Sequence, residues 1–203
     1  MPPNCVTPML LEGDDDYRVW SQVPRHHQIT LAAIPCNGEE IRRYQRSLEQ
    51  IFASLQEPGE RPVGFALLDG DKPLPVPNPD APQRFIRYLQ LACHESENLY
   101  LTDEVLADMD LTWSEASERI VTQAENFGRK QGLLQAAKTW DRRTADIKPI
   151  MRELELILDV HRMHWTTRVG SVIGRKRPEG QLLDFLGPDV VGSLWGAPQP
   201  VTP

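Results

Sequence analysis

Proline is distributed very unevenly along this chain of 203 residues. The chain has 18 prolines, yet only Pro149 lies between residues 83 and 177. Because proline removes a backbone donor and breaks the interior of helices, a long stretch that almost lacks it is free to be helical. The distribution therefore predicts a mainly α-helical protein whose C-terminal part, residues 82–170, is a helical bundle.

A proline-rich segment comes just before this region. It reads "GDKPLPVPNPDAP", residues 70–82, with prolines at nearly alternating positions. Such spacing favours an extended polyproline conformation over a helix. We interpret residues 71–81 as a linker or as a strap that crosses the surface.

The part before the linker has a different pattern. The segments "HQITLAAI" (27–34) and "VGFALLDG" (63–70) have the composition of strands, and "YRVWSQ" (17–22) is a third candidate. Between the first two, apolar residues recur at steps of three and four, which predicts an amphipathic helix. These residues are Ile41, Tyr44, Leu48, Ile51 and Leu55. We therefore expect a small α/β unit over 17–70, with an α+β fold as the alternative to the mainly α class.

Several helices are expected after the linker. A first one runs through "QRFIRYLQLACHES" (83–96), and a short one follows over 103–109. "TWSE" (112–115) is a capping box that opens a long helix. Gly128 and Gly132 lie inside that helix, where they either mark a bend or let another helix approach closely.

The overall composition limits the class of protein. The hydrophobic fraction is 40% and the net charge is −7, which suits a globular chain. The three cysteines are widely spaced, as expected for reduced thiols of an intracellular protein. Residues 1–16 lack the pattern of a signal peptide and are interpreted as a flexible segment. Since no run suits a membrane span, a cytoplasmic protein is expected, with a nuclear one as the alternative.

The segment "MRELELILDVHRMHWTTR" (151–168) is predicted to lie in a helix that runs from Pro149 to about Thr167. A helical projection gives it a narrow polar wedge and a wide apolar arc. His161 and His164 fall near the middle of that arc. We interpret them as histidines of a core or interface, with a metal site and a pH-dependent switch as alternatives.

Carboxylates suggest one enzymatic alternative. Asp69 and Asp71 end the second predicted strand, where α/β enzymes often place catalytic groups, although a plain turn explains them equally well. The run "GDDD" (13–16) is either a solvated acidic segment or part of a divalent-ion site. Because the chain has no nucleophile elbow, P-loop or dinucleotide fingerprint, no catalytic residue, resident metal or cofactor is predicted.

Charge is segregated along the chain. Residues 119–177 hold 13 Lys/Arg and six Asp/Glu, a net charge of +7. This region compensates the acidic flanks of the same chain, faces an acidic partner or faces nucleic acid. The residues that would contact nucleic acid are Arg142, Arg143, Lys148, Arg168, Arg175, Lys176 and Arg177.

The C-terminal tail, residues 171–203, contains the apolar segment "QLLDFLGPDVVGSLW" (181–195). Such a segment cannot form a core alone, so it either packs back on the body or docks into a partner. The side chains that would bind a partner are Leu182, Leu183, Phe185, Leu186, Leu194 and Trp195.

Taken together, these patterns favour a non-catalytic interaction or assembly subunit that binds a protein partner or self-associates. Nucleic-acid association through the basic region is the first alternative. A small enzyme with its site near Asp69 and Asp71 is the second alternative.

Overall fold

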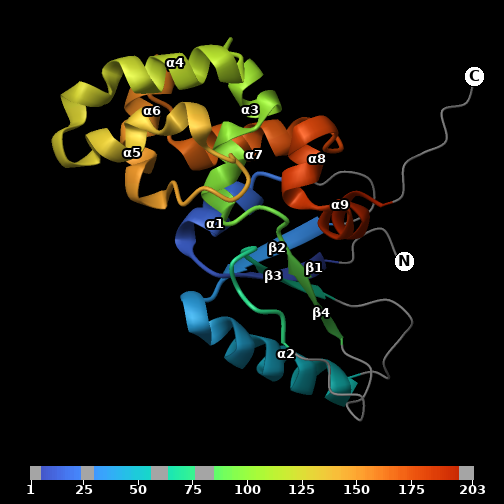
Figure 1. The fold of residues 1–203 in the computed structure, drawn as a ribbon. Helices are drawn as coiled ribbons and strands as arrows, with labels where there is room; N and C mark the ends of the chain where they lie inside the picture. Colours follow the sequence, from blue (N-terminus) through green and yellow to red (C-terminus); the bar gives the residue numbers. More distant parts are fainter. Residues whose placement is uncertain (1–5, 24–29, 56–63, 76–84, 197–203) are drawn as a thin grey trace, which may run out of the picture.

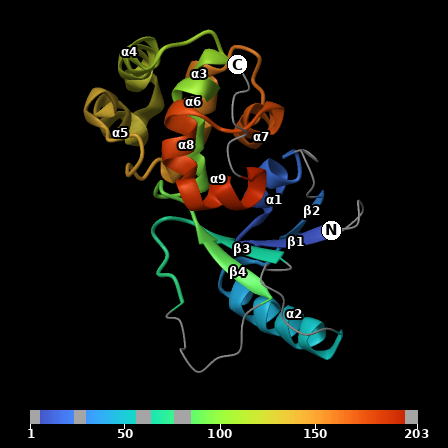
Figure 2. The same cartoon turned by 90° about the vertical axis from the view of Figure 1, so that its right-hand side faces the viewer.

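A four-stranded parallel sheet forms the middle layer of the protein. The computed structural model describes residues 6–23, 30–55, 64–75 and 85–196, so residues 76–81 of the predicted linker lie outside the described residues. One helix covers one face of the sheet, and a larger group of helices covers the other (Figures 1 and 2). The chain is thus mainly helical with a small α/β unit, as the sequence predicted.

The sheet has the order β2-β1-β3-β4, and every pair of neighbours is parallel. Its strands are β1 (Val6–Leu11), β2 (Thr30–Pro35), β3 (Gly64–Leu68) and β4 (Ile86–Gln90). The predicted strands over 27–34 and 63–70 are confirmed for their described residues. The flexible segment predicted for 1–16 is wrong for its described residues, 6–16, because β1 lies in the centre of the sheet. Residues 17–22 are not a strand, since α1 (Asp14–Trp20) covers most of them.

Burial on both faces explains why β1 can occupy the centre. Met9 and Leu11 are completely buried in the core on the side of the larger helical layer, whereas Leu10 is buried in the core on the opposite side. Strands of a parallel sheet that are covered on both faces read as continuous apolar runs rather than as alternating ones. The run "MLL" fits this pattern, although it is too short to be conspicuous in the sequence.

The amphipathic helix predicted for the N-terminal unit is confirmed. A short 3-10 turn, η1 (Gly38–Glu40), leads into α2 (Ile41–Leu55), which covers one face of the sheet alone (Figure 1). Ile41 is buried against the sheet, and Glu49 accepts hydrogen bonds from the backbone N–H groups of Phe85 and Ile86. These bonds fasten α2 to the start of β4.

The other face carries α1 and the helices that follow β4 (Figure 2). The remaining elements are η2 (Ser96–Leu101), α3 (Asp103–Ala107), α4 (Trp113–Gln123), η3 (Ala124–Lys130), α5 (Gln131–Gln135), η4 (Ala137–Thr139), η5 (Lys148–Ile150), α6 (Met151–Leu158), α7 (Trp165–Arg175), α8 (Gly180–Leu186) and α9 (Pro188–Trp195). Within the described ranges, none of the helices has the length and apolar character required to cross a membrane.

The helical bundle predicted for 82–170 is not confirmed. This range contains β4, so the helix predicted over 83–96 is wrong. The helices also share one buried core with the strands, because Leu11 and Leu89 of the sheet belong to the same cluster as Ile120 and Leu154. These helices therefore pack on one face of the sheet.

The long helix that begins at the capping box is bent. The Thr112 hydroxyl accepts the N–H of Glu115, which confirms the predicted start of α4. The backbone leaves helical geometry at Phe127 and Gly128, where Gly128 has a φ of 48°. A Cβ added at Gly132 would meet no described atom within 4 Å, so close helix approach does not explain that glycine. Of the two alternatives, the bend is the one observed.

The continuous helix predicted from Pro149 to about Thr167 is also wrong. Helix α6 ends at Leu158, and α7 starts only at Trp165. The reason is the carboxylate of Asp159, which is 2% exposed and accepts hydrogen bonds from the buried Arg168 guanidinium at 2.7 and 3.2 Å. A carboxylate or a guanidinium that is buried without an oppositely charged partner is strongly destabilising. This ion pair therefore fixes the break between α6 and α7.

The break places both histidines at the surface. His161 and His164 are exposed in the loop between α6 and α7, so their assignment to the core is wrong, whereas a place in a protein interface stays a prediction. His164 precedes α7, and its Nδ1 lies 2.8 Å from the Thr166 hydroxyl oxygen. The role that the structure shows for this ring is therefore that of a helix cap.

We predict that Gly170→Ala lowers the free energy of unfolding by about 1–3 kcal/mol through overpacking. A Cβ at this position in α7 would lie 2.9 Å from the Val19 carbonyl oxygen of α1. Gly132→Ala is the matched control and should be neutral or stabilising, because that position is open and helical. Urea denaturation of both variants measures the difference, and equal stabilities would contradict this view of the packing between α1 and α7.

Candidate functional site

The order of the strands creates a switch point between β1 and β3. From β1 the chain passes through α1 to β2, which lies on one side of β1. It then returns from β2 through α2 to β3, which lies on the other side of β1. The two helices lie on opposite faces of the sheet (Figure 1). In open α/β sheets, ligands bind outside the carboxyl ends of the strands at such a point. Glu12 directly follows β1 and Asp69 directly follows β3, so these carboxyl groups flank the switch point.

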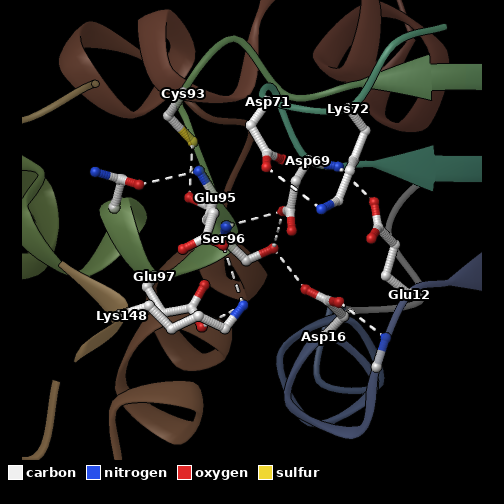
Figure 3. A network of polar contacts seen from close by, with 12 residues as sticks. Glu12, Asp16, Asp69, Asp71, Lys72, Cys93, Glu95, Ser96, Glu97 and Lys148 are labelled. Carbon is white, nitrogen blue, oxygen red and sulfur yellow. Dashed lines mark hydrogen bonds and ion pairs between the residues drawn. The ribbon is translucent and has the colours of Figure 1, made fainter. Parts of the chain in front are cut away.

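Five carboxyl groups gather at this edge of the sheet, and we call them the acidic cluster (Figure 3). They are Glu12, Asp16, Asp69, Asp71 and Glu97. Asp69 and Asp71 are the pair that the sequence proposed, and Asp16 belongs to the "GDDD" run. Sequence reasoning missed Glu12 and Glu97, and the position of Glu12 directly after an apolar run was the one signal for it.

Backbone groups fix the members that follow β1 and β3. The N–H of Asp69 donates a hydrogen bond to Glu12 Oε1 at 3.1 Å and so joins the two strand ends. The N–H of Gly13 donates to Asp16 Oδ2 at 3.1 Å, which holds that carboxylate at the first turn of α1. The positions of the carboxylates therefore follow from the register of β1 and β3 rather than from flexible side chains.

Ser96 lies between two carboxyl groups of the cluster (Figure 3). Its hydroxyl donates to Asp16 Oδ1 at 2.5 Å, and its backbone N–H donates to Asp69 Oδ1 at 3.0 Å. The Ser96 hydroxyl oxygen is also only 3.3 Å from Asp69 Oδ1. Because Ser96 is just 2% exposed, it acts as a rigid spacer that holds the two repelling carboxyl groups apart.

The turn after β3 packs closely against the loop after β4. A Cβ added to Gly70 would lie 2.0 Å from the Cys93 carbonyl oxygen, so only glycine fits between Asp69 and Asp71. The side-chain amide of Gln90 donates to the carbonyls of Asp69, Gly70 and Lys72 at 3.3, 3.2 and 2.5 Å. These contacts fix the turn that presents both aspartates.

Two lysines reach the edge of the cluster. Lys148, which the sequence analysis named for nucleic-acid binding, lies 3.2 Å from Glu95 Oε1 and 3.3 Å from Glu97 Oε1. Partial burial lowers its pKa, but the two glutamates outweigh this effect and leave the pKa above its ordinary value. Lys72 pairs with Asp71 at 3.3 Å. Both lysines are therefore charged at the edge of the acidic cluster.

Burial makes the charge of the cluster unfavourable. Desolvation, followed by the neighbouring Asp16 and Glu12, raises the pKa of Asp69 to about 8. Burial also raises the pKa of Asp16, Glu12 and Glu97 above their ordinary values. Asp69 therefore holds a proton at a pH where an isolated carboxyl group is ionised, and a divalent cation could replace this proton.

Among the described residues the acidic cluster forms no group of three ligand atoms within 4.8 Å of one another, so an ion there would bind one or two carboxylates and keep most of its water shell. Mg²⁺ typically binds one or two carboxylates and completes its octahedron with water and phosphate oxygens. Glu12 and Asp69 on either side of the switch point are the first candidates for direct ligands. Asp16 and Asp71 raise the pKa of Glu12 by their charge, so they lie near it and would act on an ion through water.

The C-terminal tail packs on the rest of the same chain. Leu182, Phe185, Leu186 and Leu194 are at most 6% exposed, whereas Leu183 and Trp195 are partly buried. The Phe185 carbonyl accepts the N–H groups of Ala92 and Cys93 at 3.0 and 2.9 Å. Of the two alternatives for this segment, packing back on the body is the one seen. Partner binding through these residues stays a prediction, and it would require α8 and α9 to leave the core.

The basic residues named for nucleic-acid binding mostly make contacts within the chain. Arg168 is buried between Asp108 and Asp159, and Arg175 also contacts Asp108. Arg142 donates to the Leu101 carbonyl and to Asp103.

Two further members of this basic set also make internal contacts: Lys176 pairs with Glu179, and Arg177 donates to the Gly196 carbonyl. Burial raises the pKa of Cys93 above its ordinary value, and the positive charge of Arg143 opposes this shift with a smaller effect. Nucleic-acid binding by this set stays a prediction.

No family model, curated protein or solved structure matches the chain. A function for the acidic cluster must therefore follow from its own geometry and charge.

We predict that the metal-free protein loses stability as the pH rises from about 4 to about 8. The folded-state pKa of Asp69 is about 8, above the ordinary value of 3.8, so the folded state holds a proton that the unfolded chain releases across this window. Asp69→Asn should flatten this decline and raise the free energy of unfolding at pH 8 by at least about 1.4 kcal/mol, the equivalent of one pKa unit.

Denaturation in a chelating buffer at several pH values measures this effect. Asp184→Asn, at an exposed position of α8, is the control and should keep the slope of the wild type. Should Asp69→Asn prove less stable than the wild type at pH 8, the unfavourable charge assigned to Asp69 would be refuted.

Proposed function

We propose that this protein is a divalent-cation-dependent phosphoesterase whose active site is the acidic cluster. One observation carries the proposal: Glu12 and Asp69 flank the switch point of the sheet and are joined by a hydrogen bond of 3.1 Å. This proposal develops the enzymatic alternative drawn from Asp69 and Asp71.

Charge supports the divalent cation. The acidic cluster brings together five carboxyl groups, whereas Lys72 and Lys148 contact only its edge through Asp71 and Glu97. Asp69 is only 8% exposed, so water screens its repulsion from Asp16 poorly. A divalent ion compensates such charge far better than the partial positive charges of N–H and O–H donors.

The mixture of acids and lysines supports a phosphate ester as substrate. A Mg²⁺ ion held by few carboxylates supplies Lewis acidity and lowers the pKa of bound water. Glu12 and Asp69 would position the ion, and Asp16 or Asp71 would accept the proton of the attacking water. Lys72 and Lys148 would offset the negative charge of the phosphate.

The reaction is hydrolysis. The oxygen of water forms a bond to phosphorus while the bond between phosphorus and the ester oxygen breaks. The proton taken from water by a carboxylate is returned to the departing alkoxide, which leaves as an alcohol. No oxidant or further reactant is needed, and the products are a phosphate with one fewer ester bond and the alcohol.

Hydrolysis of two generic substrates tests this function. The full chain is incubated with bis(p-nitrophenyl) phosphate, a diester, and with p-nitrophenyl phosphate, a monoester, in the presence of Mg²⁺ or Mn²⁺. We expect release of nitrophenol from one of them that a chelator abolishes. Asp69→Asn and Glu12→Gln should each lower kcat/KM at least about 100-fold, as loss of a charge-stabilising group typically does.

Asp184→Asn is the control and should keep full activity, because this exposed position lies in α8. Activity that survives both the chelator and Asp69→Asn would contradict the proposal. Failure to hydrolyse either ester with either ion would contradict it as well.

Self-association is a second candidate property, and α2 gives it a specific observation. Tyr44, Ile51 and Leu55 are 41%, 50% and 74% exposed, at spacings that place them along one side of the helix. Exposed apolar stripes of this kind often mark interfaces. This supports the assembly role that the sequence favoured, without competing with a site at the carboxyl edge of the sheet.

We predict that Ile51→Glu/Leu55→Glu shifts the full chain toward the monomer in sedimentation equilibrium at tens of micromolar. Leu133→Glu in α5 is the matched control, because Leu133 is similarly exposed, at 47%. A wild-type chain that is already monomeric at this concentration would contradict self-association through α2.

A further inference from the structure

Three side chains of metal-binding type meet beside the acidic cluster. His94 and Glu95 follow β4, and Asp146 precedes η5. Each offers one ligand atom, and these three atoms lie within 4.8 Å of one another. The residues come from two loops about 50 positions apart in the sequence, so no local sequence motif predicts that they lie together.

Hydrogen bonds hold the two loops together. The N–H of His94 donates to the Arg143 carbonyl at 2.8 Å. The side-chain amide of Asn98, which is completely buried, donates to the carbonyls of Arg142 and Ala145, both at 2.8 Å. The backbone on both sides is therefore fixed, and His94 stays opposite Asp146.

The side chains themselves remain accessible to an ion. His94 and Glu95 are half-buried, and Asp146 is exposed. Zn²⁺ binds imidazole nitrogen and carboxylate oxygen at about 2.0–2.2 Å, which places two ligand atoms of a tetrahedral site about 3.4 Å apart. Small rotations of these side chains would bring the three ligand atoms from 4.8 Å or less to that separation.

We propose that His94, Glu95 and Asp146 form a binding site for a transition-metal ion of the Zn²⁺ type. An imidazole with two carboxylates favours such an ion over Mg²⁺, which prefers oxygen ligands alone. Three protein ligands leave at least one coordination position for water. This site goes beyond the proposed function, because it shares no ligand with the acidic cluster.

Lys148 connects the proposed metal site to the acidic cluster. Its ammonium group contacts both Glu95 Oε1 and Glu97 Oε1. A metal ion on Glu95 competes with this ammonium group and leaves Lys148 to Glu97 of the acidic cluster. A metal ion bound at the proposed site would thus change the charge balance beside the acidic cluster, although the ion would not bind to the cluster itself.

The exposed histidines between α6 and α7 provide a contrast. His164 faces Glu155 at 3.9 Å and shares its Nδ1 with Thr166. No group of three potential ligands forms around His161 or His164 among the described residues. His161→Asn is therefore a matched control for His94→Asn.

Co²⁺ is a suitable probe, because a histidine-containing site of low coordination number gives it a visible absorption spectrum. The full, metal-stripped chain is titrated with Co²⁺ in excess Mg²⁺, which keeps the acidic cluster occupied. We expect an absorption band that saturates at one equivalent and is displaced by one equivalent of Zn²⁺.

His94→Asn and Asp146→Asn should each weaken Co²⁺ binding at least about 100-fold, more than loss of a supporting group does. The Asp146 variant guards against misfolding, because this residue is exposed. His161→Asn and Asp69→Asn should bind Co²⁺ like the wild type. The result of Asp69→Asn separates this site from the proposed phosphoesterase, whose activity that variant removes.

Two results would overturn the proposal. One is a wild-type titration without a saturable band at one equivalent. The other is a band that persists in both His94→Asn and Asp146→Asn.

Discussion

The burial of carboxyl groups that repel one another is the constraint on which the rest of this structure depends. Asp69 is 8% exposed and has Asp16, Glu12 and Glu97 as acidic neighbours, which together with desolvation raise its pKa to about 8. A chain that only had to fold would place such groups in water, where their charges cost little. At the edge of the sheet these carboxyl groups are buried although their burial is unfavourable for folding. Unfavourable burial of this kind is typical of functional sites.

Several contacts between strands and loops hold these buried carboxyl groups in position. The parallel pairing of β1 with β3 brings Glu12 beside Asp69, and Ser96 at the start of η2 keeps Asp69 and Asp16 apart. The buried side chain of Asn98 fastens the loop before η5, which carries Lys148 to the glutamates. The helical layer thus contributes a lysine and a rigid wall to a site that the strands create.

The sequence predicted the parts of the fold whose patterns are local. The periodicity of α2, the apolar run of β3 and the capping box at Thr112 each depend on neighbouring residues, and each prediction is confirmed. β1 was missed because six residues among prolines look like a tail, and β4 because its alternation is imperfect. Asp69 was found at a strand end, whereas Glu97 and Lys148 join it only through tertiary contacts that no local pattern records. His161 and His164 were misplaced since the buried pair of Asp159 and Arg168, a tertiary interaction, breaks the helix.

The most direct test of the central claim is an anomalous-scattering map from crystals of the full chain that contain Mn²⁺, a common substitute for Mg²⁺. We expect a peak at the switch point, within ligand distance of a carboxylate oxygen of Glu12 or Asp69, that is lost in Asp69→Asn crystals. A wild-type map with no ion at the carboxyl ends of β1 and β3 would contradict it.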